Sequence, residues 1–422
     1  MDSYSKTYEN DIYFFLPMTA VDTKRAFRDL SDANMRREDE EEKEENPSFG
    51  DSYCDILTDH VLYECNNATF RTLERFYLGQ FELACYDDNY DGTVLDVEPV
   101  HLFVTAHRKT GLYIVTLAIH DNRYIPTQLI DQMSTDHLDI RRPGEADFVP
   151  AEQYLYDRFG LTLCGESKCV ACLSNKPEDE LELAYILAGE TYVSEHIDYH
   201  LNDNRVAPLL ENHACYDYYE SYISRSVIAF VFEDYPDSIF DRLDDEASVL
   251  FVVEIVLFQN TAVLRTNRRV VEELDENDGI TNAEIEELYL EFGQTMKFWS
   301  TDIFKYPFSQ LEAEEVIRSF GIDKALDEYH RNQTFIDRLI EIKSNMANEV
   351  ADGRMNFILY CLAWFEGGAG VLAGFLWALT TFFHVENTTW WTVGTVAVLF
   401  TAAVFLWFGV VKGRVQKKKK KR

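Results

Sequence analysis

"HLFVTAHRKTGLYIVTLAIHD" occupies residues 101–121. Two runs rich in β-branched and aromatic residues flank a Lys-Thr-Gly turn at 109–111, a pattern typical of a β-hairpin. Segments 11–18 and 226–234 have a similar composition and are predicted to be further strands. The sequence therefore predicts a sheet built around this hairpin.

Two other segments have the spacing of helices. Residues 177–192 begin with proline and acidic residues and then carry apolar residues at helical spacing. Residues 281–292 open with Thr281 and Glu284 in the positions of a capping box. Strand-like and helix-like segments alternate early in the chain, which favours a cytoplasmic α/β domain over residues 1–305.

The apolar run at 248–264 is long enough to raise the question of a membrane span. Glu254, Gln259 and Asn260 interrupt it. Polar residues of this kind are expensive in a bilayer, so we predict a buried helix or strand of the domain instead.

The charge of the chain is strongly acidic. It has 74 Asp and Glu against 39 Lys and Arg, for a net charge of -35. The low-complexity stretch 34–51 is dense in acidic residues and is predicted to be a mobile loop. An acidic surface repels a nucleic-acid backbone, so no direct nucleic-acid binding is expected. The same surface would concentrate cations.

Two apolar runs near the C-terminus are each longer than the roughly 20 residues that cross a bilayer. Residues 355–383 contain one charged residue, Glu366, and residues 390–411 contain none. The connector 384–389 has no Lys or Arg, whereas the tail 412–422 holds eight. The positive-inside rule then places both chain ends in the cytoplasm. The sequence predicts a hairpin of two transmembrane helices in the inner (plasma) membrane.

A polar stripe is predicted along the helix that precedes the first span. No proline occurs from about 313 to 383, so residues 306–354 are expected to form one long stalk helix that continues into the span. At about 100° per residue, one face of this helix is polar before the membrane and small within it, in unbroken phase. The polar part consists of Asp327, Arg331, Thr334, Arg338, Glu341, Asn345, Asp352 and Asn356, and the small part of Ala363, Gly367, Gly370, Gly374, Ala378 and Thr381.

Two interpretations of this stripe are open. A polar face is usually solvated, and a small-residue face in a membrane helix is usually a packing face, here with Gly370 and Gly374 in a GxxxG motif. Alternatively, several copies of the helix line a pore, where backbone carbonyls and polar rings replace the hydration shell of an ion. The unbroken phase favours the pore. Glu366 lies at the edge of the stripe. Its carboxylate would either line the mouth of a pore or reach the cytoplasmic membrane interface beside Trp364.

The layout of the chain resembles the CorA superfamily of divalent-cation channels. The resemblance rests on the acidic α/β domain, the long helix leading into the first of two spans, the short connector and the "KKKKKR" end. It implies a homopentamer in a lipid bilayer, with the first membrane helices lining the pore. The family's Gly-Met-Asn filter motif is absent, since residues 380–391 are "TTFFHVENTTWW". CorA-like proteins without it include membrane effectors of type III CRISPR systems, which a nucleotide second messenger opens.

Three functional hypotheses are open, and none is enzymatic. The first is an antiviral effector whose small nucleotide ligand opens a pore that permeabilises the membrane. The second is a magnesium transporter regulated by its acidic domain, with a divalent cation as the only cofactor considered. The third is a non-conducting sensor that the hairpin anchors. The sequence contains no nucleophile elbow, P-loop or Gly-rich dinucleotide turn that would favour an enzyme.

Residues 87–98, "DDNYDGTVLDVE", match the pattern of an EF-hand calcium loop. The ligand positions are Asp87, Asn89, Asp91 and Glu98. However, Pro99 follows where the exiting helix should run, and a strand-like segment comes next. We therefore interpret an Asp-Gly β-turn in preference to a calcium loop.

Three cysteines are closely spaced in "CGESKCVAC": Cys164, Cys169 and Cys172. Together with His213 or Cys215 downstream they could hold zinc or an iron–sulfur cluster. The distance to the downstream residues suits neither pattern, so packed free thiols are the preferred interpretation.

Overall fold

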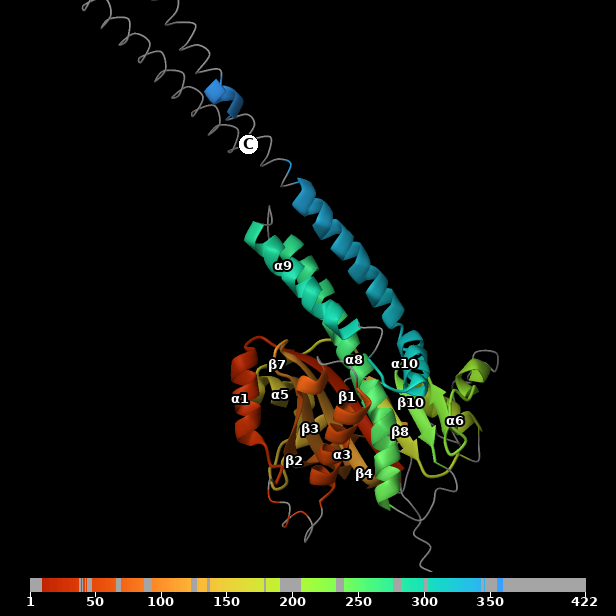
Figure 1. Ribbon diagram of the computed structural model, residues 1–422. Coiled ribbons are helices and arrows are strands. Elements are labelled where there is room, and N and C mark those ends of the chain that lie inside the picture. Colours follow the sequence, from red (N-terminus) through yellow and green to blue (C-terminus); the bar gives the residue numbers. More distant parts are fainter. Residues whose placement is uncertain are drawn as a thin grey trace, which may run out of the picture. The chain divides into compact units, whose positions relative to one another are not determined.

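Figure 1 shows the computed structural model of the chain of 422 residues. The chain divides into two units, Met1–Arg338 and Leu339–Arg422, and the packing described below is that of the first. The structure describes residues 10–37, 39, 41, 43, 48–65, 70–86, 93–122, 127–134, 137–177, 180–189, 206–232, 239–275, 282–299, 303–342, 345 and 355–359.

The first unit is built on one mixed sheet, which has ten strands within the described residues. The strand order is β6-β5-β2-β3-β4-β1-β8-β10-β9, and β7 also pairs with β1. Neighbouring strands are antiparallel except for β8 and β10, which are parallel. The strands are β1 (Asn10–Ala20), β2 (Leu73–Tyr86), β3 (Val94–His107), β4 (Leu112–Asn122), β5 (Asp139–Arg141), β6 (Val149–Pro150), β7 (Leu161–Leu163), β8 (Lys168–Leu173), β9 (Glu220–Ile223) and β10 (Val227–Val231).

The hairpin that the sequence predicts is confirmed. Strands β3 and β4 pair from His107 with Leu112 to His101 with Ala118. Gly111 ends the turn at φ 66°, a left-handed conformation that favours glycine. The strands predicted at 11–18 and 226–234 are confirmed as β1 and β10.

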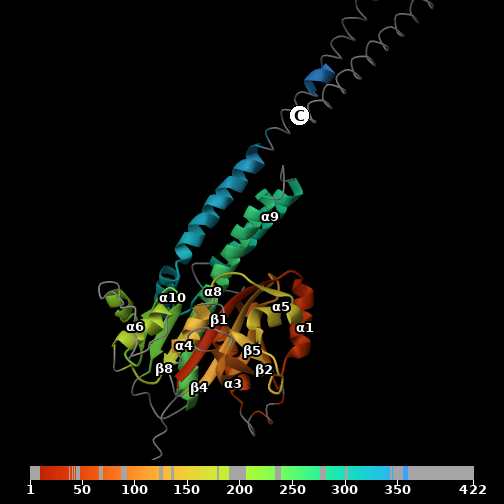
Figure 2. The same ribbon diagram turned by 180° about the vertical axis from the view of Figure 1, so that it is seen from behind.

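Side chains alternate between two apolar faces of the sheet, as the strand period requires. In β1, Ile12 and Phe14 belong to one core cluster, whereas Tyr13 and Phe15 belong to the other. Helices α1, α4, α5 and α6 cover the first face, and helices α3, α8 and α10 cover the second (Figure 2). The helices are α1 (Thr23–Ala33), α3 (Phe49–Glu64), α4 (Thr127–Ser134), α5 (Ala151–Phe159), α6 (Glu180–Ala188), α8 (Ile239–Asp275), α9 (Asn282–Thr295) and α10 (Pro307–Ser319), with short 3-10 turns η1 (Phe70–Thr72), η2 (Ala207–Leu210) and η3 (Met296–Trp299).

Helix α8 is the central element of the second face. It has 37 residues, which corresponds to a length of about 55 Å. Its portion Arg242–Glu273 is long and apolar enough to cross a membrane, and 89% of the apolar window is buried within the structure. The run 248–264 is therefore a buried helix, one of the two predicted alternatives. The helices predicted at 177–192 and 281–292 are confirmed as α6 and α9.

The acidic stretch 34–51 is more ordered at its ends than the sequence predicts. The backbone N–H of Met35 donates to the carbonyl oxygen of Tyr77 at 2.7 Å. The Nε of Arg37 lies 2.7 Å from Asp51 Oδ2, and Arg36 pairs with Asp55. The prediction of a mobile loop is wrong for these residues, because the few basic side chains of the stretch bind carboxylates of α3, which begins within it at Phe49.

The single stalk helix predicted over 306–354 is interrupted. Helix α10 ends at Ser319, and Gly321 takes a left-handed conformation at φ 70°. Phe320 is buried in the second core cluster, so the chain is fixed to the domain at this point. A separate helix begins at 322 and continues to 342. The sequence contains no proline here, but a glycine in the left-handed conformation ends a helix equally well.

The predicted membrane hairpin lies outside the described residues, apart from 355–359, which are helical and exposed. What the structure establishes is an α/β region on a mixed sheet, followed by helices, with one long apolar helix at its centre.

Candidate functional site

The helix 322–342 packs against α8 and α9 along one narrow apolar edge. Ile322, Tyr329 and Ile336, each seven residues from the next, are buried. The Tyr329 hydroxyl donates to the carbonyl oxygen of Phe292 in α9 at 2.9 Å, and the two rings lie 4.9 Å apart between centroids. Apolar residues spaced seven positions apart form a single seam along a helix, and this spacing explains why the contact is narrow.

An asparagine pair joins the same helix to α8. The Nδ2 of Asn267 donates to the carbonyl oxygen of Ala325 at 2.9 Å. The Oδ1 of Asn267 accepts from Nδ2 of Asn332 at 3.0 Å. These polar contacts fix the register of helix 322–342 on α8, because each asparagine must face its partner.

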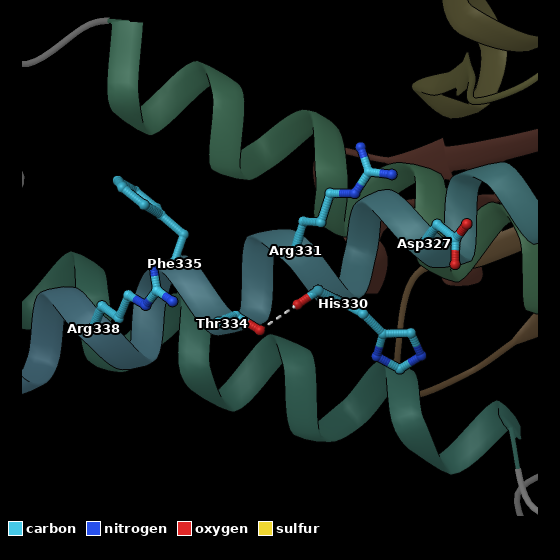
Figure 3. A pocket seen from close by; sticks show the side chains of 6 residues that line it. All are labelled: Asp327, His330, Arg331, Thr334, Phe335 and Arg338. Atoms are coloured by element: carbon cyan, nitrogen blue, oxygen red, sulfur yellow. Dashed lines mark hydrogen bonds between the residues drawn. The ribbon is translucent and has the colours of Figure 1, made fainter.

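The opposite face of helix 322–342 is polar and lines an open groove of about 530 Å³ (Figure 3). Arg331 and Phe335 project to one side of the helix and His330 to the other. The Thr334 hydroxyl donates to the carbonyl oxygen of His330 at 2.8 Å. The lining residues are Asp327, His330, Arg331, Thr334, Phe335 and Arg338.

Four lining residues belong to the predicted stripe, and two of them carry positive charge. Arg331 and Arg338 are exposed, and within the described residues neither forms an ion pair. The groove therefore presents guanidinium groups to solvent, on a chain that is acidic overall. These four stripe residues lie on the exposed face of helix 322–342.

The remaining predicted stripe residues divide into two groups. Glu341, Asn345 and Asn356 are helical and exposed. The others lie outside the described residues: Asp352, Ala363, Glu366, Gly367, Gly370, Gly374, Ala378 and Thr381.

A second cavity, of about 770 Å³, lies where α8 and α9 meet the end of the sheet. Its sheet side includes Thr19 of β1, Thr110 of the β3–β4 turn and Thr162 of β7. Its helix side carries charges of both signs: Arg265, Arg268, Arg269, Glu272 and Glu273 of α8, and Glu287 and Glu291 of α9. We call this cavity the junction pocket.

Ion pairs hold α9 against α8 inside the junction pocket. The Nε of Arg265 lies 3.1 Å from Glu291 Oε1. One terminal nitrogen of Arg269 lies 2.7 Å from Glu291 Oε2, and the other lies 2.7 Å from Glu287 Oε1. Glu291 is only 6% exposed, so its two contacts are better shielded from water than ordinary surface pairs, whereas Glu287 is exposed. We call the four side chains the arginine–glutamate latch.

The third arginine of the pocket is differently placed. Arg268 is exposed, and within the described residues its only hydrogen bond is to the carbonyl oxygen of Leu163, at 3.5 Å. It has no carboxylate partner among those residues. Its guanidinium is therefore available to a ligand in the pocket.

Buried charges fix the other half of α8 to the sheet. Arg75 of β2 pairs with Glu254, and both side chains are 2% exposed. The Nε of Arg242 lies 2.7 Å from Glu246 Oε1, and the Tyr13 hydroxyl donates to Glu246 Oε2 at 3.0 Å. Burial raises the pKa of Glu246, and the nearby Asp11 carboxylate raises it further. These contacts give Glu246 and Glu254 the partners that buried carboxyl groups need.

The calcium-loop alternative at 87–98 is contradicted by the strand that follows. Glu98 lies inside β3, opposite Leu83 of β2, where an EF-hand would have its exiting helix. Strands β2 and β3 pair up to Tyr86 and Val94, as expected for a hairpin connection. The other candidate ligands, Asp87, Asn89 and Asp91, lie outside the described residues.

The cysteine cluster does not form a metal site. Cys169 and Cys172 both lie on β8, but Cys169 belongs to the first core cluster and Cys172 to the second, on opposite faces of the sheet. Successive side chains of a strand point to opposite faces, so two residues three positions apart lie on opposite faces. Cys164 lies beyond β7, with its sulfur 3.9 Å from the carbonyl oxygen of Thr261. The preferred interpretation of packed free thiols is confirmed for these three residues.

Burial raises the pKa of all three thiols, as expected for cysteines packed in a core. Among the residues that the structure describes, no group of three or more His, Cys, Asp or Glu side chains is placed to hold a metal ion.

The junction pocket is the part of the candidate site that sequence reasoning missed. The segment "RTNRR" at 265–269 contains its three arginines, and Glu287 and Glu291 stand four residues apart. Both spacings place the charges on one helical face, which was a usable signal. Which faces meet depends on tertiary packing, and the pattern of either helix alone does not contain it. Comparisons with protein-family models, curated proteins and solved structures found no match to this chain.

Proposed function

We propose that the chain is a homo-oligomeric membrane ion channel of CorA-like build, gated by its α/β domain. Copies of helix 322–342 surround the cytoplasmic entrance, and the apolar runs 355–383 and 390–411 form the membrane part in the inner membrane. The observation that carries the proposal is the two-faced character of helix 322–342. One edge packs on α8 and α9, and the other face is polar, exposed and grooved.

The sequence around this helix supports the proposal. The polar face is in helical phase with the small-residue face of the first apolar run. The connector between the two runs lacks a Gly-Met-Asn filter. The missing filter favours a weakly selective pore over a magnesium transporter. The proposed entrance carries charge of both signs, because Arg331 and Arg338 share the polar face with Asp327 and Glu341.

A weakly selective pore must be closed at rest, since an open one would collapse the membrane potential. Each elementary charge that crosses 100 mV carries about 2.3 kcal/mol. We therefore propose that a ligand of the α/β domain opens the pore, as in an antiviral effector that permeabilises the membrane. Moving the open fraction from 1% to 99% requires about 5.5 kcal/mol of differential ligand affinity.

Assembly is the first test of this function. The full chain in detergent should form a closed ring, with five copies expected, when its mass is measured by mass photometry. A monodisperse monomer at concentrations where the chain stays folded would remove the pore.

Ion selectivity is the second test. In planar bilayers, Glu366→Gln should leave assembly intact and lower the permeability of cations relative to anions, measured as a shift in reversal potential. An unchanged reversal potential would show that Glu366 does not rim the pore. A sustained magnesium-selective current without ligand would favour the transporter. An intact ring that never conducts would favour the anchored sensor.

A further inference from the structure

The junction pocket touches both the sheet and the helices that precede helix 322–342. Thr19 and Thr162 come from strand ends, with their hydroxyl oxygens 3.3 Å apart. Glu287 and Glu291 come from α9, whose Phe292 carbonyl accepts the Tyr329 hydroxyl. A ligand in the pocket would contact the sheet and also Glu291. The next residue of α9, Phe292, accepts the hydrogen bond from Tyr329 of helix 322–342.

The arginine–glutamate latch is the interaction that such a ligand would change. Glu291 accepts from both Arg265 and Arg269 and thereby ties α9 to α8. Arg265 also donates to the carbonyl oxygen of Thr110, so the same guanidinium contacts the β3–β4 turn. An anion in the pocket competes with Glu291 for these donors.

Charge and geometry indicate which kind of anion fits. Four glutamates line the pocket beside its three arginines, so its charge alone does not select an anion. The geometry does, because three guanidinium groups within five residues of α8 offer forked donors that match the oxygens of phosphate groups. Arg268 has no carboxylate partner among the described residues and can bind without displacing anything. The threonine hydroxyls on the sheet side are suited to a hydroxyl-bearing remainder of the same molecule. A volume of about 770 Å³ is within the range of small-molecule sites.

We propose that a small phosphate-bearing molecule binds in the junction pocket, is held first by Arg268, and takes Arg265 and Arg269 away from Glu291. Release of Glu291 loosens α9 from α8 and thereby frees the edge on which helix 322–342 packs. The binding step stands on the pocket alone, whereas the opening of a pore by this step rests on the proposed function.

Competition between the anion and Glu291 fixes the direction in which a substitution at Glu291 changes binding. Removing the charge of Glu291 removes the competitor, so Glu291→Gln should bind the anion more tightly. A pocket that bound a cation through its glutamates would bind more weakly after the same change. A purely structural ion pair would leave binding of the anion unchanged.

The test uses the full chain in detergent with inorganic pyrophosphate as the probe, measured by calorimetry. Pyrophosphate should bind to the unmodified chain, about tenfold more tightly to Glu291→Gln, and at least tenfold more weakly to Arg268→Gln. Arg28→Gln, which alters an exposed arginine of α1, is the matched control and should bind as the unmodified chain does. Binding that Glu291→Gln weakens or leaves unchanged would overturn the proposal, as would no binding to either chain.

Hydrogen exchange separates this inference from the proposed function. Pyrophosphate should speed amide exchange in α9, and Glu291→Gln should do so without ligand. Neither readout requires conduction. Binding and faster exchange with no current in bilayers would therefore contradict the channel and leave the pocket assignment intact. Current without any effect of pyrophosphate on exchange would contradict the pocket assignment alone.

Discussion

Helix α8 and helix 322–342 are both long, but their surroundings differ. In α8 the apolar window is 89% buried, and its charged residues Glu246 and Glu254 have buried partners from other elements. Helix 322–342 has three buried apolar residues on one edge, and its other residues, charged and apolar alike, are at least partly exposed. An element that buries little apolar area detaches from the rest of the fold at a lower free-energy cost than one that buries much. We therefore regard α8 as the fixed axis of the domain and helix 322–342 as the element that can move.

The largest expected effect concerns the buried charges of α8. Arg75→Met leaves Glu254 unpaired inside the core and should lower the free energy of unfolding by about 3–5 kcal/mol. The change would be measured by denaturant unfolding of the full chain in detergent. The double variant Arg75→Met, Glu254→Leu removes both charges and should recover most of the loss. If the single and double variants were equally stable, the charges would not fix α8.

A pH-dependent effect is expected next, at Glu312 of α10, which packs on α8. Burial raises the pKa of Glu312 to about 7, while a hydrogen bond from Tyr219 acts in the opposite direction. The folded state therefore binds a proton that the unfolded state releases at lower pH. This contribution to stability is fully present below about pH 4.5 and is lost as the pH rises through about 7.

The corresponding variant is Glu312→Gln, which cannot ionise. At pH 8 it should be more stable than the unmodified chain by about 1–3 kcal/mol, with the difference vanishing near pH 4.5. Unfolding would be measured at both pH values. Glu314→Gln, at an exposed position of the same helix, serves as the control. Parallel pH profiles for Glu312→Gln and the unmodified chain would contradict a neutral buried carboxyl group.

A smaller effect is expected where helix 322–342 contacts α9. Tyr329→Phe keeps the ring contact with Phe292 and removes only the hydrogen bond to its carbonyl oxygen. The loss should be about 1 kcal/mol, and it should appear as faster amide exchange in residues 322–338 rather than in α8. If amide exchange became equally faster in helix 322–342 and in α8, the two helices would unfold as one unit. That result would contradict the view that helix 322–342 moves while α8 stays fixed.

The sequence predicts those features that are set by local pattern. The hairpin at 101–121 follows directly from the strand period and was predicted, whereas the seam of Ile322, Tyr329 and Ile336 has a helical period but was not singled out. Periodicity does not reveal that Gly321 adopts a left-handed conformation, so the helix break was missed. The strand period did contain the answer for Cys169 and Cys172, since three residues along a strand reverse the face.

The junction pocket could not be predicted in the same way, for a physical reason. Its arginines and glutamates come from two helices, and its threonines come from three separate parts of the sheet. Each helix taken alone presents an ordinary charged face, and only the docking of α9 on α8 brings Arg269 to Glu291. Long-range packing, rather than local propensity, creates this site.

The central claim is that copies of helix 322–342 meet along the polar face. Cross-linking between copies tests it most directly, with Thr334→Cys at the centre of that face and Glu328→Cys, exposed and about 120° away around the helix, as the matched control. The unmodified chain gives the background from its own cysteines. Under mild oxidation in membranes, we expect disulfide-linked dimers from Thr334→Cys and only background from Glu328→Cys. Equal cross-linking at both positions, or none at Thr334→Cys in an assembled ring, would contradict a shared polar axis.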